Sequence, residues 1–252
     1  RIDDEGQKFI GLQRLFGRET FWRDYDWVWL PDDDLAVEPS GIERLFAMVE
    51  ALGFDLAQPA LDWHSHYSFG ITLRSPSFSV RCTDMVEIMA PCFSRAFLER
   101  CLPTFDENLT GWGLSFVWPQ LLGTGLRRCG ILDDVTVTHT RAVGGPAYDA
   151  LRAEGASPHA ERARVLARHG LPAQPHPRTL GAIDRNARWI DGRRRGDAGR
   201  LARLQERDAW AFHAARPMIE ATALGRRPEH RAPLGLEPSQ LRAIAADMPF
   251  GT

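Results

Sequence analysis

The sequence predicts an α/β protein, because strand-like segments alternate with segments of helical periodicity along its first half. An aromatic and branched run, Tyr25–Leu30, stops abruptly at Pro31 and has the character of a buried strand. A helical pattern follows that opens at Pro39 and ends at Gly53. A second strand is expected over Asp55–Leu61. This alternation is typical of a sheet covered by helices.

Three segments have the apolar spacing of helices. Gln7–Phe16 repeats apolar residues at roughly helical intervals. The helix that opens at Pro39 has Ser40 as its expected N-cap, and Gly53 is a typical helix stop. Ser94–Cys101 is the third helix. Together they supply the layers that would cover the sheet.

The remaining segments of the first half are shorter. Tyr67–Arg74 and Phe78–Arg81 alternate weakly, which predicts a hairpin or two edge strands. Met85–Ala90 is a short apolar run that carries one acid. Asn108–Leu122 holds a Gly-Trp-Gly element followed by a helix, and Gly130–His139 is the last expected strand.

From about Gly144 the composition changes, since prolines, alanines and arginines dominate and large apolar residues become rare. A Pro-rich stretch, Leu171–Pro177, has the character of a linker. Four segments in this part have amphipathic helical patterns: Glu161–His169, Leu180–Ile190, Ala198–Arg216 and Pro238–Met248. We therefore expect an α/β core over residues 1–143 and a helical C-terminal extension over residues 144–252.

Composition narrows the class of protein. The 252 residues carry a formal net charge of −2, so the chain lacks the excess of positive charge expected of a protein that binds nucleic acid. No apolar run reaches the roughly 18–20 residues that a membrane span needs. The four cysteines have no CxxC spacing, as expected of reduced core residues in a cytoplasmic protein.

Three consecutive carboxylates follow the first strand. Asp32 and Asp34 would converge in an extended chain, whereas Asp33 would point elsewhere. Two hard carboxylate oxygens suit Mg²⁺ or Mn²⁺, which in turn would neutralise a diphosphate. The alternative is an acidic turn, because aspartates favour turns and helix N-caps. The spacing alone leaves both interpretations open.

Two further elements are candidates for the same site. His139 directly follows the last expected strand, where it could complete a metal shell or be an ordinary loop histidine. Gly111 and Gly113 would let the backbone approach a ligand, and Trp112 offers an apolar platform for a sugar face. The alternative to a ligand-binding element is an ordinary turn whose tryptophan packs in the core.

Five short segments in a fixed order carry a family resemblance. They are residues 28–35 (VWLPDDDL), 58–62 (QPALD), 86–95 (VEIMAPCFSR), 111–114 (GWGL) and 137–139 (VTH). In this order they resemble DUF707, a family sometimes labelled lysine-ketoglutarate reductase trans-splicing related. That family in turn looks like the nucleotide-diphospho-sugar transferases of the GT-A fold. The resemblance spans roughly Gln7–Arg141, and the reductase label implies no dehydrogenase chemistry, since no GxGxxG motif is present.

The resemblance implies a mixed sheet flanked by helices that lacks its N-terminal strands. Either these strands lie upstream of Arg1 in the full protein, or the chain cannot bind a nucleotide well alone. The resemblance also implies Mn²⁺ or Mg²⁺ and a nucleotide-sugar donor, with a carbohydrate or other hydroxyl as acceptor. The implied metal ligands are Asp32, Asp34 and His139. The implied substrate-binding residues are Asp33, Asp62, Trp112, Gly113 and Ser115, with Trp112 and Gly113 in a loop that closes over the donor sugar. Glu87, on a strand edge, would contact donor or acceptor hydroxyls.

One position departs from the family pattern. Ser115 stands where relatives usually carry an acid, and in many GT-A enzymes an acid in that neighbourhood activates the acceptor. Glu87, Asp106 or Glu107 would have to replace that base, because a hydroxyl cannot act as a general base at neutral pH without help. Two hypotheses follow: a metal-dependent glycosyltransferase, or a non-catalytic carbohydrate- or nucleotide-binding domain with the same fold. A haloacid-dehalogenase-like phosphatase is disfavoured, since it needs a hydroxyl where Ala36 stands.

Overall fold

The computed structural model of the protein describes residues 6–123, 128–142, 155, 157–222 and 235–248. Across these residues eight strands form one open sheet in the order β1-β5-β3-β6-β4-β7-β8, and β2 pairs with β6 beside this path. The strands are β1 (Trp27–Trp29), β2 (Leu35–Ala36), β3 (Leu56–Leu61), β4 (Phe78–Thr83), β5 (Cys92–Ser94), β6 (Cys129–His139), β7 (Thr179–Asp184) and β8 (Trp189–Asp191). β3 and β6 are parallel, whereas the other pairs are antiparallel. The prediction of an α/β protein is confirmed, in the form of a mixed sheet.

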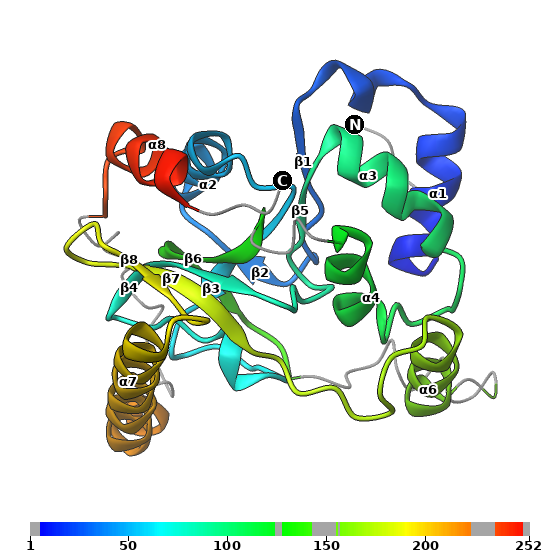
Figure 1. Ribbon diagram of the computed structural model, residues 1–252. Coiled ribbons are helices and arrows are strands. Elements are labelled where there is room, and N and C mark those ends of the chain that lie inside the picture. Colours follow the sequence, from blue (N-terminus) through cyan, green and yellow to red (C-terminus); the bar gives the residue numbers. More distant parts are fainter. Residues whose placement is uncertain (1–5, 124–127, 143–154, 156, 223–234, 249–252) are drawn as a thin grey trace.

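Helices cover both faces of this sheet (Figure 1). The helices are α1 (Lys8–Arg18), α2 (Pro39–Leu52), α3 (Arg95–Cys101), α4 (Leu114–Leu121), α6 (Pro158–Arg168), α7 (Arg195–Thr222) and α8 (Pro238–Asp247). Three 3₁₀ turns, η1 (Phe21–Asp24), η2 (Gly70–Thr72) and η3 (Leu102–Thr104), lie between them. Among the described helices, none is long and apolar enough to cross a membrane.

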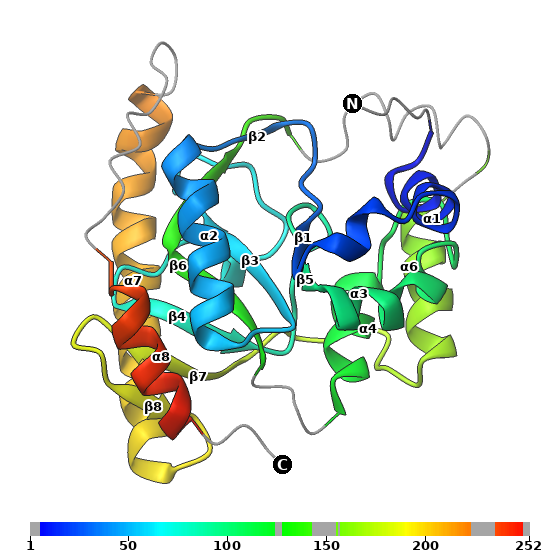
Figure 2. The ribbon, with the colours of Figure 1, turned by 90° about the horizontal axis from the view of Figure 1, so that it is seen from above.

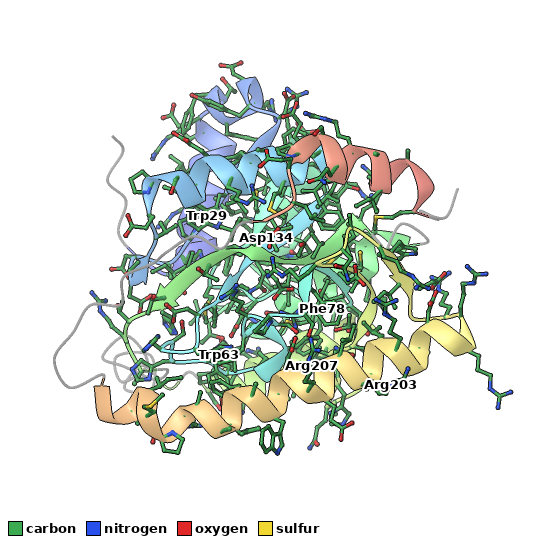
Figure 3. The ribbon with its side chains drawn as sticks, turned by 90° about the vertical axis from the view of Figure 1, so that its left-hand side faces the viewer. Trp29, Trp63, Phe78, Asp134, Arg203 and Arg207 are labelled. Atoms are coloured by element: carbon green, nitrogen blue, oxygen red, sulfur yellow. The ribbon has the colours of Figure 1, made fainter. Side chains whose placement is uncertain are left out.

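The two faces of the sheet carry different helices. α2 and α8 lie on one face, and α7 runs along the other (Figure 3). The alternation of side chains along a strand explains this division. Ile183 of β7 packs in the cluster that holds the buried side chains of α2, whereas its neighbour Ala182 packs with Leu201 of α7.

A second group of helices gathers beside the β1 and β5 edge of the sheet. α1, α3, α4 and α6 lie together there (Figure 2). Their core is aromatic: the Phe9 ring lies 5.0 Å from Phe105, and the Phe93 ring lies 5.1 Å from Trp118, both edge to face. Such pairs add roughly 0.5–1.5 kcal/mol each beyond the burial of their area. This core fixes the position of α1 and α4, which border the cavity described below.

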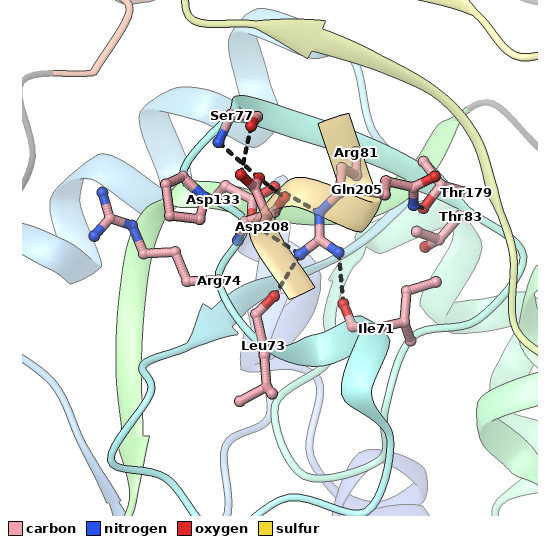
Figure 4. A network of polar contacts seen from close by, with 12 residues as sticks. Ile71, Leu73, Arg74, Ser77, Arg81, Thr83, Asp133, Thr179, Gln205 and Asp208 are labelled. Atoms are coloured by element: carbon pink, nitrogen blue, oxygen red, sulfur yellow. Dashed lines mark hydrogen bonds and ion pairs between the residues drawn. The ribbon is translucent and has the colours of Figure 1, made fainter. Parts of the chain in front are cut away.

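A buried polar network joins α7 to the sheet (Figure 4). Arg81 of β4 makes a bidentate ion pair with Asp133 of β6, with both N···O distances at 2.8 Å, and also donates to the carbonyls of Ile71 and Leu73. Asp208 of α7 accepts hydrogen bonds from the Ser77 amide and hydroxyl. Burial raises the pKa of the Asp133 carboxyl, and the charge of Arg81 opposes this shift. The network therefore holds residues 62–77 against the sheet.

Several predicted elements differ from the structure. β1 is not a buried strand: its three residues are half-buried, and it is the edge strand that pairs with β5. The N-cap of α2 is Glu38 rather than Ser40, because Pro39 takes the first helical position; Gly53 ends the helix in the left-handed conformation, as predicted.

Of the hairpin or two edge strands predicted from Tyr67–Arg74 and Phe78–Arg81, only a strand over Phe78–Arg81 is confirmed, as part of β4. Residues 62–77 are irregular apart from η2, since Arg81 binds their carbonyls, and β4 lies inside the sheet between β6 and β7. Met85–Ala90 lies in the loop between β4 and β5, so Glu87 is on a loop and not on a strand edge.

The predicted helix Leu180–Ile190 is wrong, and β6 is not the last strand. The segment forms the hairpin of β7 and β8, whose turn is capped by Asp184, which accepts from the amides of Asn186 and Arg188. The extension over residues 144–252 is therefore not entirely helical, and its strand β7 pairs with β4 of the first half. The helices expected around α6, α7 and α8 are confirmed.

Candidate functional site

A cavity of about 870 Å³ lies among the loops at the carboxyl ends of the parallel strands β3 and β6. Open α/β sheets bind ligands at this end of their strands. Most of the sequence-predicted site residues line it: Asp32, Asp33, Asp34, Glu87, Trp112, Gly113, Ser115 and His139. The cavity therefore brings together segments that are more than 100 residues apart in the chain.

Strand pairing sets Asp34 beside His139. The two-residue strand β2 pairs with the end of β6 so that Leu35 lies opposite His139. The backbone carbonyl of Asp34 accepts from the amide of Thr140 at 3.0 Å, which ties the acidic turn to β6. As a result, Asp34 Oδ2 and His139 Nε2 are 3.2 Å apart.

The other ring nitrogen of His139 fixes its orientation. Nδ1 lies 2.8 Å from the backbone carbonyl oxygen of His66, which can only accept a hydrogen bond. Nδ1 therefore donates, and in the neutral ring Nε2 turns its lone pair to the Asp34 carboxylate. Asp34 Oδ1 is buried and has no hydrogen-bond partner among the described residues. A proton or a metal cation would be needed between Nε2 and this carboxylate.

Asp32 has a different partner, which the sequence did not reveal. The ammonium of Lys8 donates to Asp32 Oδ1 at 2.7 Å and to the carbonyl oxygens of Ile88 and Met89 at 2.8 and 3.4 Å. Burial lowers the pKa of Lys8 and raises that of Asp32, while the charge of each opposes the shift of the other. Lys8 therefore counters the charge of Asp32 without a metal.

The three aspartates thus face different environments. They do not lie on an extended strand, because Asp33 and Asp34 form a turn before β2. The Asp33 side chain is 88% exposed and lies 3.7 Å from Arg141, whereas that of Asp34 is 14% exposed. Within the described ranges, no three His, Cys, Asp or Glu side chains are grouped so as to hold a metal ion by themselves.

Glu87 lies on the loop of residues 84–91 and is held from both sides. Its amide donates to Gln58 Oε1 of β3 at 2.6 Å. The amides of its neighbours, Val86 and Ile88, donate to the backbone carbonyl and the hydroxyl of Ser115. Ser115 therefore accepts hydrogen bonds from the loop that carries Glu87.

Burial changes the acidity of Glu87. Its side chain is buried, and Oε2 has no hydrogen-bond partner within the part of the chain that the structure describes. Desolvation and, to a smaller extent, the charge of Asp32 raise its pKa to about 8, against a lowering by its hydrogen bond with Ser68. The carboxyl therefore holds its proton at neutral pH and can exchange it slightly above.

The Gly-Trp-Gly element is a tight turn between the aromatic core and α6. Gly111 and Gly113 have φ values of +73° and +103°, and a Cβ atom on Gly113 would lie 3.1 Å from Val165 of α6. Asn108 closes the turn, since its Oδ1 accepts from Gly111 N and its Nδ2 donates to the Trp112 carbonyl. The glycines are required by this packing, and the indole of Trp112 lines the cavity.

Three predicted residues do not line the cavity. Asp62 caps its own turn by accepting from the His64 amide and contacts the Thr138 hydroxyl. Glu107 lies 2.9 Å from His169 Nε2 of the segment after α6, and Asp106 is exposed. Neither of the last two is among the residues that line the cavity.

Several cavity residues were not predicted, among them the cations Lys8 and Arg162. Lys8, the chain's single lysine, begins α1, and Arg162 lies in the middle of α6. Arg162 occurs within a segment that was predicted to be helical, but nothing in its spacing points to a ligand. The one available signal for Lys8 was its rarity among many arginines, which is weak because composition also explains it.

Comparison with known proteins identifies the family to which the chain belongs. The family model described as "Protein of unknown function (DUF707)" matches residues 18–171, and the chain belongs to this family. The searches of curated proteins and of solved structures found no match. The matched residues include the acidic turn, Glu87, the Gly-Trp-Gly turn, His139 and Arg162.

Proposed function

We propose that the protein is a metal-dependent glycosyltransferase that moves a sugar from a nucleotide-sugar donor to an acceptor hydroxyl. The observation that carries the proposal is the pairing of Asp34 with His139, whose Nδ1 is held by the His66 carbonyl, at the edge of a large cavity. Metal-binding histidines usually donate their other nitrogen to a carbonyl or carboxylate in this way. The GT-A likeness of the sequence supplies the reaction class.

The donor set fits Mn²⁺ or Mg²⁺. Asp34 would provide carboxylate oxygen, including the unpartnered Oδ1, and His139 would provide Nε2. Such ions are commonly held by one or two protein groups, with substrate phosphates and water as the remaining ligands. Asp32 is a weaker candidate, because Lys8 already binds it. When bound, the metal would stabilise the charge of a leaving diphosphate.

Glu87 is the group we assign to proton transfer. Glu87 lines the cavity, its buried Oε2 has no hydrogen-bond partner among the described residues, and a pKa of about 8 lies close to a neutral working pH. A general base works best with a pKa near the working pH. Trp112 and Phe69, also in the cavity wall, provide apolar faces on which a sugar ring can stack.

The experiment is hydrolysis or transfer of nucleotide-sugar donors in the presence and absence of Mn²⁺. The wild-type chain is expected to turn over a donor only with the metal, and Asp34→Ala should lose this activity. Asp26→Ala is the control, since Asp26 is an exposed carboxylate outside the cavity. Equal activity of the wild type and Asp34→Ala would refute this assignment of the site.

The second candidate is a non-catalytic domain that binds a nucleotide sugar or carbohydrate. It is favoured by Ser115, which stands where relatives usually carry an acid and whose hydroxyl accepts from the Ile88 amide. Calorimetric titration decides between the two, because metal-dependent binding of a nucleotide sugar without turnover would support the second candidate over the first.

A further inference from the structure

We propose that Arg162 of α6 forms a subsite in the cavity for an oxyanion of the ligand, a carboxylate or a phosphate. The proposal deepens the proposed function, on which it rests for the kind of ligand that enters the cavity. Arg162 lies in a helix outside residues 7–141, the range over which the sequence resembles the GT-A enzymes.

Arg162 is a cavity residue, and one of its donors is unused. Its Nε atom is buried and has no hydrogen-bond partner among the described residues. A guanidinium that keeps a free Nε–H at a cavity wall can bind a carboxylate or phosphate in a bidentate manner. A buried donor without a partner is unfavourable, and a hydrogen bond to a ligand oxygen would remove this cost.

The position of Arg162 is set by contacts on several sides. Its guanidinium carbon lies 5.8 Å from the centre of the Phe116 ring, over which it stacks. The preceding residue, Glu161, accepts hydrogen bonds from the amides of Leu109 and Thr110. Val165, on the same face of α6, packs against Gly113. The helix is thus locked to the Gly-Trp-Gly turn, and Arg162 is pre-organised beside it.

The other two cations that line the cavity among the described residues, Lys8 and Arg141, already have acidic partners. Lys8 is bound to Asp32, and Arg141 lies near Asp33. Glu161, the acid next to Arg162 in the chain, is directed to backbone amides and to Arg164. Arg162 is therefore the cavity cation best placed to receive an acid from the ligand.

The test compares the binding of three sugars by calorimetric titration. EDTA is present, so the measurement depends neither on a bound metal nor on turnover. The probes are D-glucuronate, glucose 1-phosphate and neutral glucose. The wild type is expected to bind one anionic sugar at least about tenfold more tightly than glucose. A preference for glucuronate identifies a carboxylate subsite, and one for glucose 1-phosphate a phosphate subsite.

Two variants in α6 test whether the preference for an anionic sugar over glucose depends on Arg162. Arg162→Gln should reduce the preference to within about threefold, whereas Arg164→Gln should keep it, because Arg164 is an exposed arginine of the same helix. If Arg162→Gln does not fold, Arg162→Lys keeps the charge without Nε–H and should still weaken the preference at least about threefold. No preference in the wild type, or an unchanged preference in the folded Arg162 variant, would overturn the proposal.

Failure of this proposal and failure of the proposed function are distinguishable. Asp34→Ala is expected to lose metal-dependent turnover while it retains the anion preference in EDTA. Loss of the preference in Arg162→Gln together with the absence of turnover in the wild type would support the subsite and argue for a binding domain.

Discussion

The Asp34 carboxylate and the His139 imidazole lie 3.2 Å apart although 104 residues separate them in the chain, and the His66 carbonyl holds the far side of the ring. A carboxylate that faces the lone pair of a neutral imidazole nitrogen is unfavourable unless a proton or a metal cation lies between them. The short strand β2 maintains this arrangement, since it pairs with the last residues of β6.

Loss of the imidazole should weaken Mn²⁺ binding. His139→Gln removes one of the two expected protein ligands, so we expect an affinity at least about 10-fold lower, since loss of a residue that only orients a ligand already costs about 10- to 100-fold. Electron paramagnetic resonance of free Mn²⁺ measures this. The control is His64→Gln, because His64 is an exposed histidine outside the cavity. Equal Mn²⁺ affinity of the two variants would contradict the metal site.

Glu87 should make the stability of the wild type depend on pH. Its pKa is about 8 in the folded chain and near 4.5 when unfolded, so the folded state holds an extra proton between these values. Stability should therefore fall as pH rises from about 4.5 to 8, by up to about 1.4 kcal/mol per pH unit. Glu87→Gln should remove this fall.

The measurement is urea unfolding in EDTA at several pH values between 5 and 8.5. The difference in free energy of unfolding, Glu87→Gln minus wild type, is expected to increase with pH. Asp106→Asn serves as the control, since this exposed acid should leave the pH profile unchanged. A difference that stays constant over the whole range would show that Glu87 is ionised throughout.

The buried ion pair of Arg81 and Asp133 should be far more important for stability than a surface pair. Asp133→Asn leaves the Arg81 guanidinium buried without its counter-charge, and we expect a loss of roughly 3–5 kcal/mol. Asp26→Asn, which breaks a solvent-exposed pair with Arg95, should cost less than about 1 kcal/mol. Urea unfolding at pH 7 compares them, and similar losses would contradict this ranking.

Gly113 should not tolerate a side chain. At φ +103° an alanine is strained, and its Cβ would press on Val165, so Gly113→Ala is expected to destabilise the protein by roughly 1–3 kcal/mol. Gly17→Ala is the matched control, because Gly17 lies in α1 with open space around it and should gain up to about 1 kcal/mol. Thermal unfolding gives both values, and a neutral Gly113→Ala would argue against the tight turn.

Much of the fold could be predicted because its signals are local. Gly53 ends α2 through its left-handed conformation, and Ser94 caps α3 by accepting from the Phe97 amide. The β7–β8 hairpin could not be predicted in this way. Its strands are short, and their pairing depends on β4 and on the packing of Gly181 against Trp189, which no local periodicity reveals.

The candidate site was predictable in part, since Asp34, Glu87, Trp112 and His139 were recognised by the order of their motifs. Their partners were not. Lys8 reaches Asp32 only because the aromatic core carries α1 to the cavity.

The sequence by itself thus determined the α/β class, the ends of most helices and the polar groups that border the cavity. Tertiary structure alone decided that Asp34 meets His139, that Lys8 binds Asp32, and that Arg162 lines the same cavity. The physical reason is that side-chain periodicity and capping act within a few residues, whereas these contacts arise from strand register and helix packing across the whole chain.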